Sequence, residues 1–541
     1  MMEQVDMHHE TAEDFSAHIS DIVSDGLICL FIALGMDTGM FDVMISLGQP
    51  KTYQKIAETG KYKERFVEAW LGEMVSAGIV SMDSSSGTYW VPVDHQPSLH
   101  RGSKQSKPAL STLAVPMLSE AFHSVKECFK LDGPMGVPSA KYSRFDRYLS
   151  ERNSIWFNHF LIQSFIPSVP GLVERLEEGI CALDVCCGEG MATIAMARCF
   201  PKSQFFGFDF CESAVHTGQL AAEGAKLTNA HIVCHDATCL PAEWTGKFQY
   251  IFSRSGLHDQ PDPRSGLAEL KRVIADDGVM SVLEMACHSS VAANLELTFT
   301  PGLYAFSIMN CLPVSLSYDG SEGLGAVWGR EAATAMLQEC GFKVMSLRDN
   351  QGDTTMHLYC QKKKAEEQIL SKAPAISPNI EKEDAGQEKT EAFSASVIEK
   401  GMAGLICLAL ALGVDIGLFD VMISLGQPKS CQEIADAGKF KERYVREWLG
   451  AMVTSKIINM DPSSELYWIP AHRIPILQRG SKHSSPAMAA MSIPALSKAF
   501  YAVGDCFKLD GPKVVPPDIS SHCSKYILGE NSAWSVFLSR S

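Results

Sequence analysis

The first feature of this sequence that could do chemistry is a short apolar run followed by small residues. Cys181–Val185 is apolar except for Asp184, and Cys186-Cys187-Gly188-Glu189-Gly190 follows directly. The apolar periodicity of Met191–Phe200 then indicates a helix. A strand, a glycine loop and a helix in this order let the backbone approach a ligand at the carboxyl end of a parallel strand. A dinucleotide-binding Rossmann domain would show the same loop, so the loop alone does not decide the cofactor.

Two further acidic residues end the strands that are expected next. Gln204–Asp209 predicts a second strand, and Asp209 lies 19 residues after Gly190, the spacing of a carboxylate that accepts from ribose hydroxyls. A third strand, 232–237, contains Asp236. The elements expected after it are a strand at 248–252, a helix at 267–274, a turn at 276–278 and a strand at 279–285. This alternation predicts an α/β fold with a doubly wound, Rossmann-like sheet.

The order of these segments resembles that of the class I S-adenosylmethionine-dependent methyltransferases. "LDVCCGEG" is similar to their glycine-rich motif, "FFGFDF" to their ribose-binding segment, "CHDA" to their adenine-contacting segment, and "LKRVIADDGVMSVLE" to the segment that leads into their fifth strand. Within this family, "GLHDQPDP" and "EGLGAVWG" resemble small-molecule O-methyltransferases that carry a winged-helix domain in front. The resemblance covers most of 165–363 and implies S-adenosylmethionine as the cofactor, with no metal.

The resemblance also implies which residues hold the methionine end of the cofactor. Asp184, Gly188 and Gly190 match the residues of the glycine-rich motif that do so. Arg254 matches a position near the cofactor's carboxylate. Cys186 also belongs to the expected cofactor-binding set, but it stands where the family usually has glycine. Its side chain is expected to crowd the cofactor or to force a shifted loop.

The nucleoside end of the cofactor is implied in the same way. Asp209 would accept hydrogen bonds from both ribose hydroxyls, and Phe210 would pack on the adenine ring. Asp236, followed by Ala237 in the adenine-contacting segment, would accept from the adenine amino group.

His258 and Glu284 are the expected catalytic residues. In the plant O-methyltransferases the histidine that matches His258 is the base, and the acid that matches Glu284 orients it. A carboxylate stabilises the imidazolium that forms when the histidine takes a proton. Alternatively, His258 is a loop histidine that caps a turn, and Glu284 is a structural partner at a strand end. Asp259 is expected to brace the same loop, while Asn310 and Cys311 are candidates to line the acceptor pocket.

An internal repeat sets the domain organisation. Gly26–Leu30 recurs as Gly404–Leu408, and Phe41–Lys51 recurs intact as Phe419–Lys429. Both matches have the same offset of 378 residues (404 minus 26), and no gap is needed. A repeat with such a long period is a duplicated domain and not a solenoid.

The repeated unit has the pattern of a winged helix. Apolar residues at helical spacing predict helices at 15–36 and 64–77, and Thr52 predicts an N-cap for a helix between them. A two-stranded hairpin is expected at 79–82 and 88–91. Such a unit is either a DNA-binding module or a dimerisation and lid module. The resemblance to winged-helix-bearing O-methyltransferases favours the second, in which the module pairs subunits and helps to close over substrate.

Charge also argues against nucleic acid as a partner. The would-be recognition helix has a net charge of about −1, whereas a groove-entering helix should be basic. The whole chain carries a net charge of −16, which repels phosphates.

The predicted organisation has three modules. A first winged-helix-like module spans 15–157, the methyltransferase domain 165–363, a flexible linker 364–391, and a second winged-helix-like module 392–541. The second copy stops at the position of Gln163, so the chain is either a three-module protein or a truncated tandem of two full units.

Composition indicates a chain of the cytoplasm. The 17 cysteines show no CxxC pair, which argues against a zinc ribbon and favours reduced thiols. The acidic N-terminus does not resemble a signal peptide. The most apolar early stretch, Gly26–Met36, has 11 residues, while a membrane span needs about 20. It is expected to be a buried helix, with no membrane contact.

Two hypotheses of different classes follow. The first is an enzyme that transfers a methyl group from S-adenosylmethionine to a small-molecule acceptor, at a hydroxyl, and that forms a homodimer through its winged-helix module. The second is a regulator or scaffold that keeps the modules and at most senses the cofactor, being catalytically weak or inactive. Cys186 and the second module favour the regulator. The residues that favour the enzyme are Asp209, Asp236, His258 and Glu284.

Overall fold

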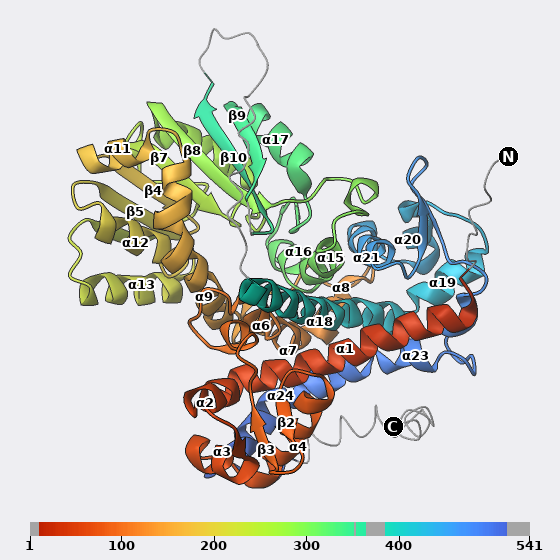
Figure 1. Ribbon diagram of the computed structural model, residues 1–541. Helices are drawn as coiled ribbons and strands as arrows, with labels where there is room; N and C mark the ends of the chain where they lie inside the picture. The colour runs from red at the N-terminus through yellow and green to blue at the C-terminus, as the bar shows by residue number, and fades with distance from the viewer. Residues whose placement is uncertain (1–9, 351–352, 364–384, 517–541) are drawn as a thin grey trace, which may run out of the picture.

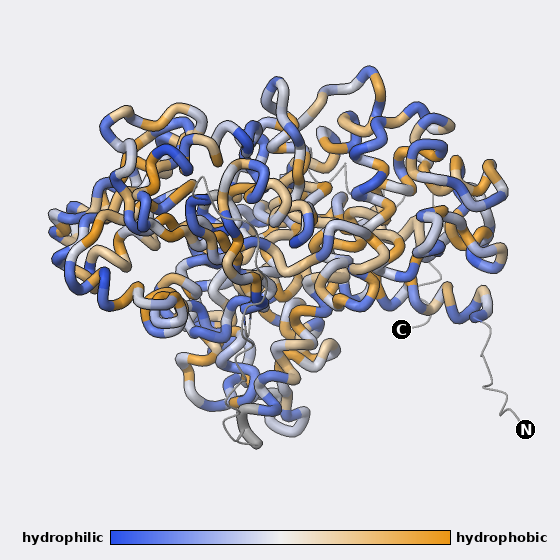
Figure 2. The backbone as a smooth tube through the Cα atoms, turned by 90° about the horizontal axis from the view of Figure 1, so that it is seen from above, coloured by the Kyte–Doolittle hydropathy of each residue, from blue (hydrophilic) through white to orange (hydrophobic). Residues whose placement is uncertain are grey.

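The computed structural model describes residues 10–350, 353–363 and 385–516. In these ranges the chain forms an α/β domain and two helical modules; in Figure 1 the first module lies below that domain and residues 418–454 of the second lie to its right. Hydrophobic positions run through both the α/β domain and the helical part (Figure 2). Both parts therefore have an apolar interior.

Within the described residues, the α/β domain contains a seven-stranded sheet. Its strands are β4 (Cys181–Val185), β5 (Gln204–Asp209), β6 (Ala230–Cys234), β7 (Phe248–Arg254), β8 (Ile274–Met285), β9 (Phe342–Asp349) and β10 (Thr355–Lys362). Their order is β6-β5-β4-β7-β8-β10-β9. Neighbours from β6 to β8 run parallel, and β10 is antiparallel to both β8 and β9. The carboxyl ends of the five parallel strands therefore share one edge.

Helices cover both faces of this sheet. They are α11 (Leu172–Glu178), α12 (Met191–Cys199), α13 (Glu212–Gly224), α14 (Pro263–Val273) and α17 (Gly329–Glu339), with the 3-10 turn η3 (Ala242–Trp244). The remaining elements of this domain, η4 (Ala292–Asn294), α15 (Thr300–Met309) and α16 (Cys311–Ser315), pack against the helical modules instead. Successive residues of β7 point into different cores, Ile251 towards Leu267 and Leu337, and Phe252 towards Met196. The predicted doubly wound sheet is confirmed.

One predicted element in this domain is wrong. Residues 276–278 are not a separate turn, because β8 runs from Ile274 to Met285 without a break. The pairing of β8 with β7 instead shifts register between Phe248 and Tyr250. A Cβ on Gly278 would lie 2.9 Å from the Phe248 carbonyl oxygen. The glycine therefore serves a close approach of two strand backbones, and not a chain reversal.

The N-terminal module has the predicted order of helices and hairpin. Its elements are α1 (Ala12–Thr38), α2 (Met40–Ser46), β1 (Lys51–Thr52), α3 (Tyr53–Gly60), α4 (Glu64–Ser76), β2 (Ser81–Asp83), β3 (Thr88–Trp90), α5 (Gln96–Leu99), α6 (Lys107–Ser111), α7 (Ala114–Ser119) and α8 (Phe122–Cys128). Thr52 caps α3 as predicted, since its hydroxyl accepts from the Lys55 N–H. The chain then reaches the sheet through η1 (Ser139–Lys141), α9 (Phe145–Trp156), the π-helix η2 (Phe157–Phe165) and α10 (Ile166–Ser168).

The C-terminal module repeats this order. Its elements are α18 (Ala385–Ile416), α19 (Leu418–Leu425), α20 (Cys431–Gly438), α21 (Glu442–Thr454), β11 (Asn459–Asp461), β12 (Leu466–Trp468), α22 (Ile474–Leu477), α23 (Ser485–Ala489) and α24 (Ser492–Phe507). α18 begins inside the expected linker, whose part at 364–384 lies outside the described residues, as does 517–541. Phe393 of α18 stacks on His95 of the first module, with the ring centres 3.7 Å apart.

The two modules pair with each other through equivalent residues. The Lys63 N–H donates to the Phe507 carbonyl at 2.8 Å, and the Lys441 N–H donates to the Phe129 carbonyl at 2.7 Å. Lys441 is the repeat of Lys63, and Phe507 is the repeat of Phe129, each 378 positions further along the chain. Both lysine ammonium groups also donate to carbonyls at the end of the opposite module, that of Lys63 to Gly511 and that of Lys441 to Gly133. The pairing is therefore reciprocal, as in a two-fold symmetric dimer.

The long helices α1 and α18 form the centre of this pairing. They lie side by side in Figure 1. A Cβ on Gly26 would lie 2.9 Å from Cys407 Sγ, and one on Gly404 would lie 3.0 Å from Cys29 Sγ. Both helices are long and apolar enough to cross a membrane by length and composition, but 61% and 72% of their apolar windows are buried inside the molecule. Their apolar character is explained by this mutual contact, and the first is the buried helix predicted from the sequence.

Candidate active site

The glycine loop after β4 has the backbone of a tight turn. Cys186, Gly188 and Gly190 all have left-handed φ angles, of 55°, 54° and 68°. A Cβ on Gly190 would lie 2.3 Å from Ile232, so this position excludes a side chain, whereas a Cβ on Gly188 would meet nothing within 4 Å. The loop therefore leaves open space at Gly188, beside the amino end of α12.

Cys186 occupies a backbone conformation that favours glycine. Its side chain lies against the loop that follows β7, where a Cβ on Gly256 would be 2.8 Å from the Cys186 Cβ. Gln260 Nε2 donates to the Cys186 sulfur at 3.4 Å. Burial raises the pKa of the thiol to about 12, so it stays protonated at neutral pH. The missing side chain of Gly256 thus provides the room for the cysteine.

Asp209 ends β5 and faces the glycine loop. One carboxylate oxygen accepts from the Gly188 N–H at 2.9 Å, and the other accepts from the Cys211 N–H at 3.0 Å. A carboxylate offers about four acceptor positions. Two positions remain for a ligand's hydroxyls, so the geometry is compatible with the predicted ribose contact.

Asp184 is buried too deeply to contact a ligand directly. It is 4% exposed. One of its oxygens accepts from both the N–H and the hydroxyl of Thr193, at 3.2 and 2.8 Å. Burial raises the pKa of this carboxyl to about 7, against the lowering effect of the Thr193 hydrogen bonds. Asp184 therefore ties α12 to β4, and it would act on a cofactor through the position of the loop.

The residues expected at the adenine end lie on the surface. Phe210 is 59% exposed, and its ring lies perpendicular to that of Tyr318, with the two ring centres 6.1 Å apart. Asp236 is exposed, and its Oδ1 accepts from the Thr238 N–H and hydroxyl, both at 2.8 Å. Ala237 follows it, half-buried. Tyr318 was not predicted, since it is more than 100 residues further along the chain.

Arg254 ends β7 and is buried in a cluster of charges. Its guanidinium pairs with Asp353 at 3.3 Å and lies 4.7 Å from the centre of the Trp156 ring. Lys107 of the first module pairs with the same carboxylate at 2.6 Å. Burial lowers the pKa of Lys107 to about 8, although Asp353 opposes this shift. The winged-helix module thus reaches the sheet edge at the position predicted to lie near the cofactor.

His258 and Glu284 form a buried pair at the same edge. His258 is 3% exposed and Glu284 is fully buried. The His258 Nδ1 lies 2.5 Å from Glu284 Oε2, and the other oxygen of Glu284 accepts from the Leu257 N–H at 3.2 Å. Burial works against a charge on His258, but Glu284 and Asp259 outweigh it and hold its pKa well above the usual range. The structure therefore brings the two expected catalytic residues into contact.

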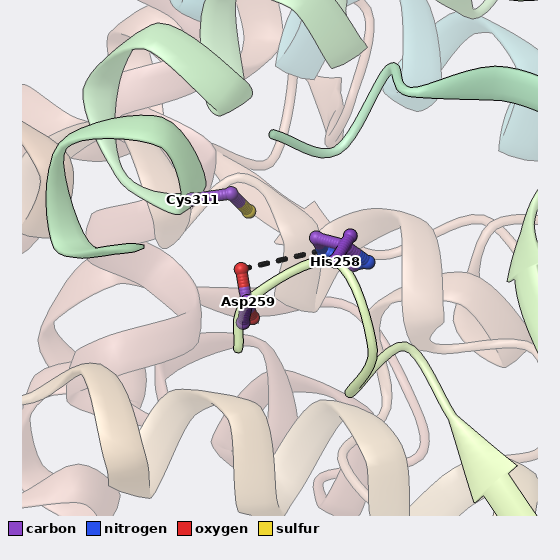
Figure 3. Close-up of side chains that lie close together, drawn as sticks. All are labelled: His258, Asp259 and Cys311. Carbon is purple, nitrogen blue, oxygen red and sulfur yellow. Dashed lines mark ion pairs between the residues drawn. The ribbon is translucent and has the colours of Figure 1, made fainter. Parts of the chain in front are cut away.

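Asp259 and Cys311 lie on the Nε2 side of His258 (Figure 3). Asp259 Oδ1 is 3.4 Å from His258 Nε2 and its side chain is 45% exposed. One donor atom from each of these three residues lies within 4.8 Å of the others, and their kinds are those that zinc accepts. Burial raises the pKa of the Cys311 thiol to about 12, so a metal would have to displace that proton. Asn310, expected in the acceptor pocket with Cys311, is 4% exposed at the end of α15.

Comparison with known proteins agrees with this architecture. Residues 26–101 and 404–479 each match the model of the Rv2258c-like winged HTH domain, and residues 176–329 match that of a methyltransferase domain. The chain thus contains a methyltransferase domain and two winged-helix domains.

Curated relatives match in the methyltransferase part. Demethylmenaquinone methyltransferase of Staphylococcus epidermidis is 32% identical over 148 residues, which is 27% of this chain and 56% of the relative. The enzyme of the same name from Staphylococcus aureus is 27% identical over 232 residues, 41% of this chain and 88% of the relative. The match therefore spans little more than half the length of the first of these relatives.

Solved structures resemble the fold over a longer stretch. Human N-acetylserotonin methyltransferase in complex with SAM is 15% identical, with a TM-score of 0.50, over 66% of this chain and 99% of that one. The mitomycin 7-O-methyltransferase is 14% identical, with a TM-score of 0.47, over 63% of this chain and 96% of that one. At this identity the human enzyme shows the fold alone.

Proposed function

We propose that this protein transfers a methyl group from S-adenosylmethionine to a hydroxyl of a small molecule. The observation that carries the proposal is the buried pair of His258 and Glu284, which stands at the carboxyl edge of the sheet beside the glycine loop. Ligands bind at this edge in open α/β sheets.

The residues at the glycine loop fit the cofactor. Open space at Gly188, free acceptor positions on Asp209 and the exposed ring of Phe210 suit a methionine, a ribose and an adenine in that order. Arg254 ends β7 at the carboxyl edge of the sheet, and its buried guanidinium, which pairs with Asp353, is the cation that we assign to the carboxylate of the cofactor. When bound, S-adenosylmethionine supplies a methyl group on a positively charged sulfur.

The work of the protein is then to position the acceptor and to remove its proton. Glu284 holds His258 by Nδ1, and Nε2 faces the side on which Asp259 and Cys311 lie, which is the side we assign to the acceptor. Since Glu284 and Asp259 raise the pKa of His258, the base form appears only as pH rises. The pair can then take the hydroxyl proton as the oxygen attacks.

The first test is isothermal titration of S-adenosylmethionine into the full chain. Asp209→Ala removes hydrogen bonds to a charged group, each of which contributes about 1.5–3 kcal/mol. We expect the affinity to fall by about 100-fold. Asp276→Ala is the control, because that side chain is 94% exposed at the start of β8. Equal affinities for both variants and the unmodified chain would contradict the assigned cofactor site.

The second test is a methyl-transfer screen over small phenols, naphthols and demethylmenaquinone, which appears in the name of the curated relatives. His258→Asn should lower turnover by roughly 100-fold or more with unchanged cofactor affinity. His288→Asn is the matched control, since His288 and Glu331 form another His–Glu pair, at 2.7 Å and partly exposed. Equal activity of the two variants would refute the role of His258.

The alternative is a regulator that senses the cofactor without turnover. The strained backbone at Cys186 is the observation in its favour. Cofactor binding without transfer to any acceptor, together with salt-sensitive binding to random DNA, would support it. The exposed face of α4 carries Glu64 and Glu68, which argues against DNA.

We also propose where and with what the chain works. Every cysteine in the described ranges is a free thiol, which fits the reducing cytoplasm. The homodimer expected from the sequence would need another surface, since the reciprocal pairing is made here within one chain.

A further inference from the structure

A loop of the catalytic domain, residues 322–328, lies between His258 and the C-terminal module. On one side the Glu322 N–H donates to the Pro261 carbonyl at 3.0 Å, three residues after His258. In the middle the Ala326 N–H donates to the Ser307 hydroxyl at 3.0 Å. A movement of this loop would therefore also displace the segment that carries His258.

The other side of the loop is held by α21. Arg443 Nε donates to the Gly323 carbonyl at 3.0 Å, and its Nη2 donates to the Leu324 carbonyl at 2.8 Å. Glu447, one turn further along α21, pairs with Arg443 Nη1 at 2.7 Å and is 5% exposed. A Cβ on Gly325 would lie 3.0 Å from both Arg443 and Glu447. The Arg443 guanidinium thus binds two carbonyls of the loop backbone, and the buried Glu447 carboxylate holds that guanidinium in place.

Helix packing supports the same contact. A Cβ on Gly450 of α21 would lie 2.5 Å from the Tyr304 ring of α15, so only glycine allows this approach. Tyr304 in turn accepts from Asn294 Nδ2 at 3.0 Å. Cys287 follows β8, and burial together with the negative charges of Glu447 and Glu284 raises the pKa of its thiol to about 12. The second module therefore reaches the neighbourhood of the catalytic pair.

The first module does not make the equivalent contact. Its residues Arg65 and Gly72, the repeats of Arg443 and Gly450, are exposed, and a Cβ on Gly72 would meet nothing within 4 Å. Ala69 stands where the second copy has Glu447. The two copies thus share a fold and a pairing surface, but in the described structure only α21 of the second copy holds loop 322–328 in this way, while the first copy contacts the catalytic domain elsewhere, for example through Lys107 and Asp353.

We propose that the C-terminal winged-helix module is a built-in partner of the catalytic domain, in which Arg443 is a positioning residue that holds loop 322–328 in place on the acceptor side of His258. The inference rests on the proposed function. Because the module is part of the same chain, the acceptor side is completed without a second molecule. Arg443 touches no reacting atom, and it acts by fixing the loop.

The experiment compares Arg443→Ala with Arg65→Ala in the full chain. Hydrogen–deuterium exchange of a peptide covering 320–329 should become at least tenfold faster in Arg443→Ala and stay unchanged in Arg65→Ala. With an acceptor from the phenol screen, the KM for that acceptor should rise about tenfold in Arg443→Ala, while the dissociation constant of S-adenosylmethionine stays within twofold. Arg443→Lys should not restore the KM, since an ammonium group cannot bridge two carbonyls and Glu447 as the planar fork does.

Exchange in the loop that is equal in the two alanine variants would overturn the inference, whether or not an acceptor has been found. A loss of cofactor affinity in Arg443→Ala would also overturn it, because the loop would then not be specific to the acceptor. Failure of the proposed function is distinguishable, since it shows as absent cofactor binding or transfer in the unmodified chain.

Discussion

The strongest test of the cofactor loop is to fill the space that Cys186 uses. Gly256→Ala places a methyl group 2.8 Å from the Cys186 Cβ, where ordinary contacts begin at 3.4 Å. The neighbours must therefore move by about 0.6 Å, in a region packed on both sides. Gly256 is not among the positive-φ glycines, so its backbone accepts alanine. Overpacking of this kind costs roughly 1–3 kcal/mol, which corresponds to a loss of roughly 2–12 °C in the melting temperature of a domain of this size.

Cys186→Gly should cancel this loss. It removes the clashing Cβ and the left-handed strain, which costs roughly 1–2 kcal/mol for a residue with a side chain. The added backbone freedom of glycine costs about 0.5–1 kcal/mol. We therefore expect Cys186→Gly alone to change stability little, and the double variant to melt near the Cys186→Gly temperature.

The assay is a double-mutant cycle on the melting temperature of the full chain, with S-adenosylmethionine affinity measured for all four proteins. A coupling as large as the Gly256→Ala loss is the expected result. Additive effects would falsify the view that Gly256 makes room for Cys186. Tighter cofactor binding in Cys186→Gly alone would show instead that the thiol crowds the ligand, as the sequence suggested.

Two further outcomes follow from the site and from the module contact. Turnover should rise with pH, because His258 becomes a base only above its raised pKa. Glu284→Gln removes the charge that raises this pKa, so the rise of turnover with pH should begin at lower pH and reach a smaller maximal turnover. A pH profile that does not shift in Glu284→Gln would exclude His258 as the titrating group. The stability that the charged pair contributes is present at low pH and is lost as pH rises through that pKa. Gly450→Val should lower the melting temperature by several degrees through its clash with Tyr304, whereas Gly72→Val should not; similar losses in both would indicate a helix-propensity effect only.

Local patterns explain what the sequence could predict. The glycine loop and the strands that end at Val185 and Asp209 depend on short segments, and the structure has these strands and a doubly wound sheet as predicted, whereas β9, β10 and the spatial order of the strands were not predicted. The pairing of His258 with Glu284 was implied by the resemblance. In the structure His258 follows β7 and Glu284 lies near the carboxyl end of the neighbouring strand β8. The turn at 276–278 failed, since two acids and a glycine in a row also suit a strand irregularity.

Long-range contacts explain what the sequence could not predict. Asp353 pairs with Arg254 across 99 residues and with Lys107 across 246, and neither partner has a local signal. Arg443 carries no signal in the sequence, because its counterpart Arg65 is also an arginine and is exposed in the structure. The replacement of Ala69 by Glu447 is one of five differences between residues 64–76 and 442–454, and nothing in the sequence distinguishes it from the other four.

The reciprocal pairing of the two modules, in which Lys63 and Lys441 each bond to the opposite module, also affects how this protein responds to dilution. Partners on one polypeptide meet at an effective concentration on the order of millimolar, whatever the number of molecules in the cell. An assembly of separate chains dissociates when it becomes scarce, and its specific activity falls. Here the ratio of module to catalytic domain is set by translation, so turnover per molecule should be the same at nanomolar and at micromolar enzyme.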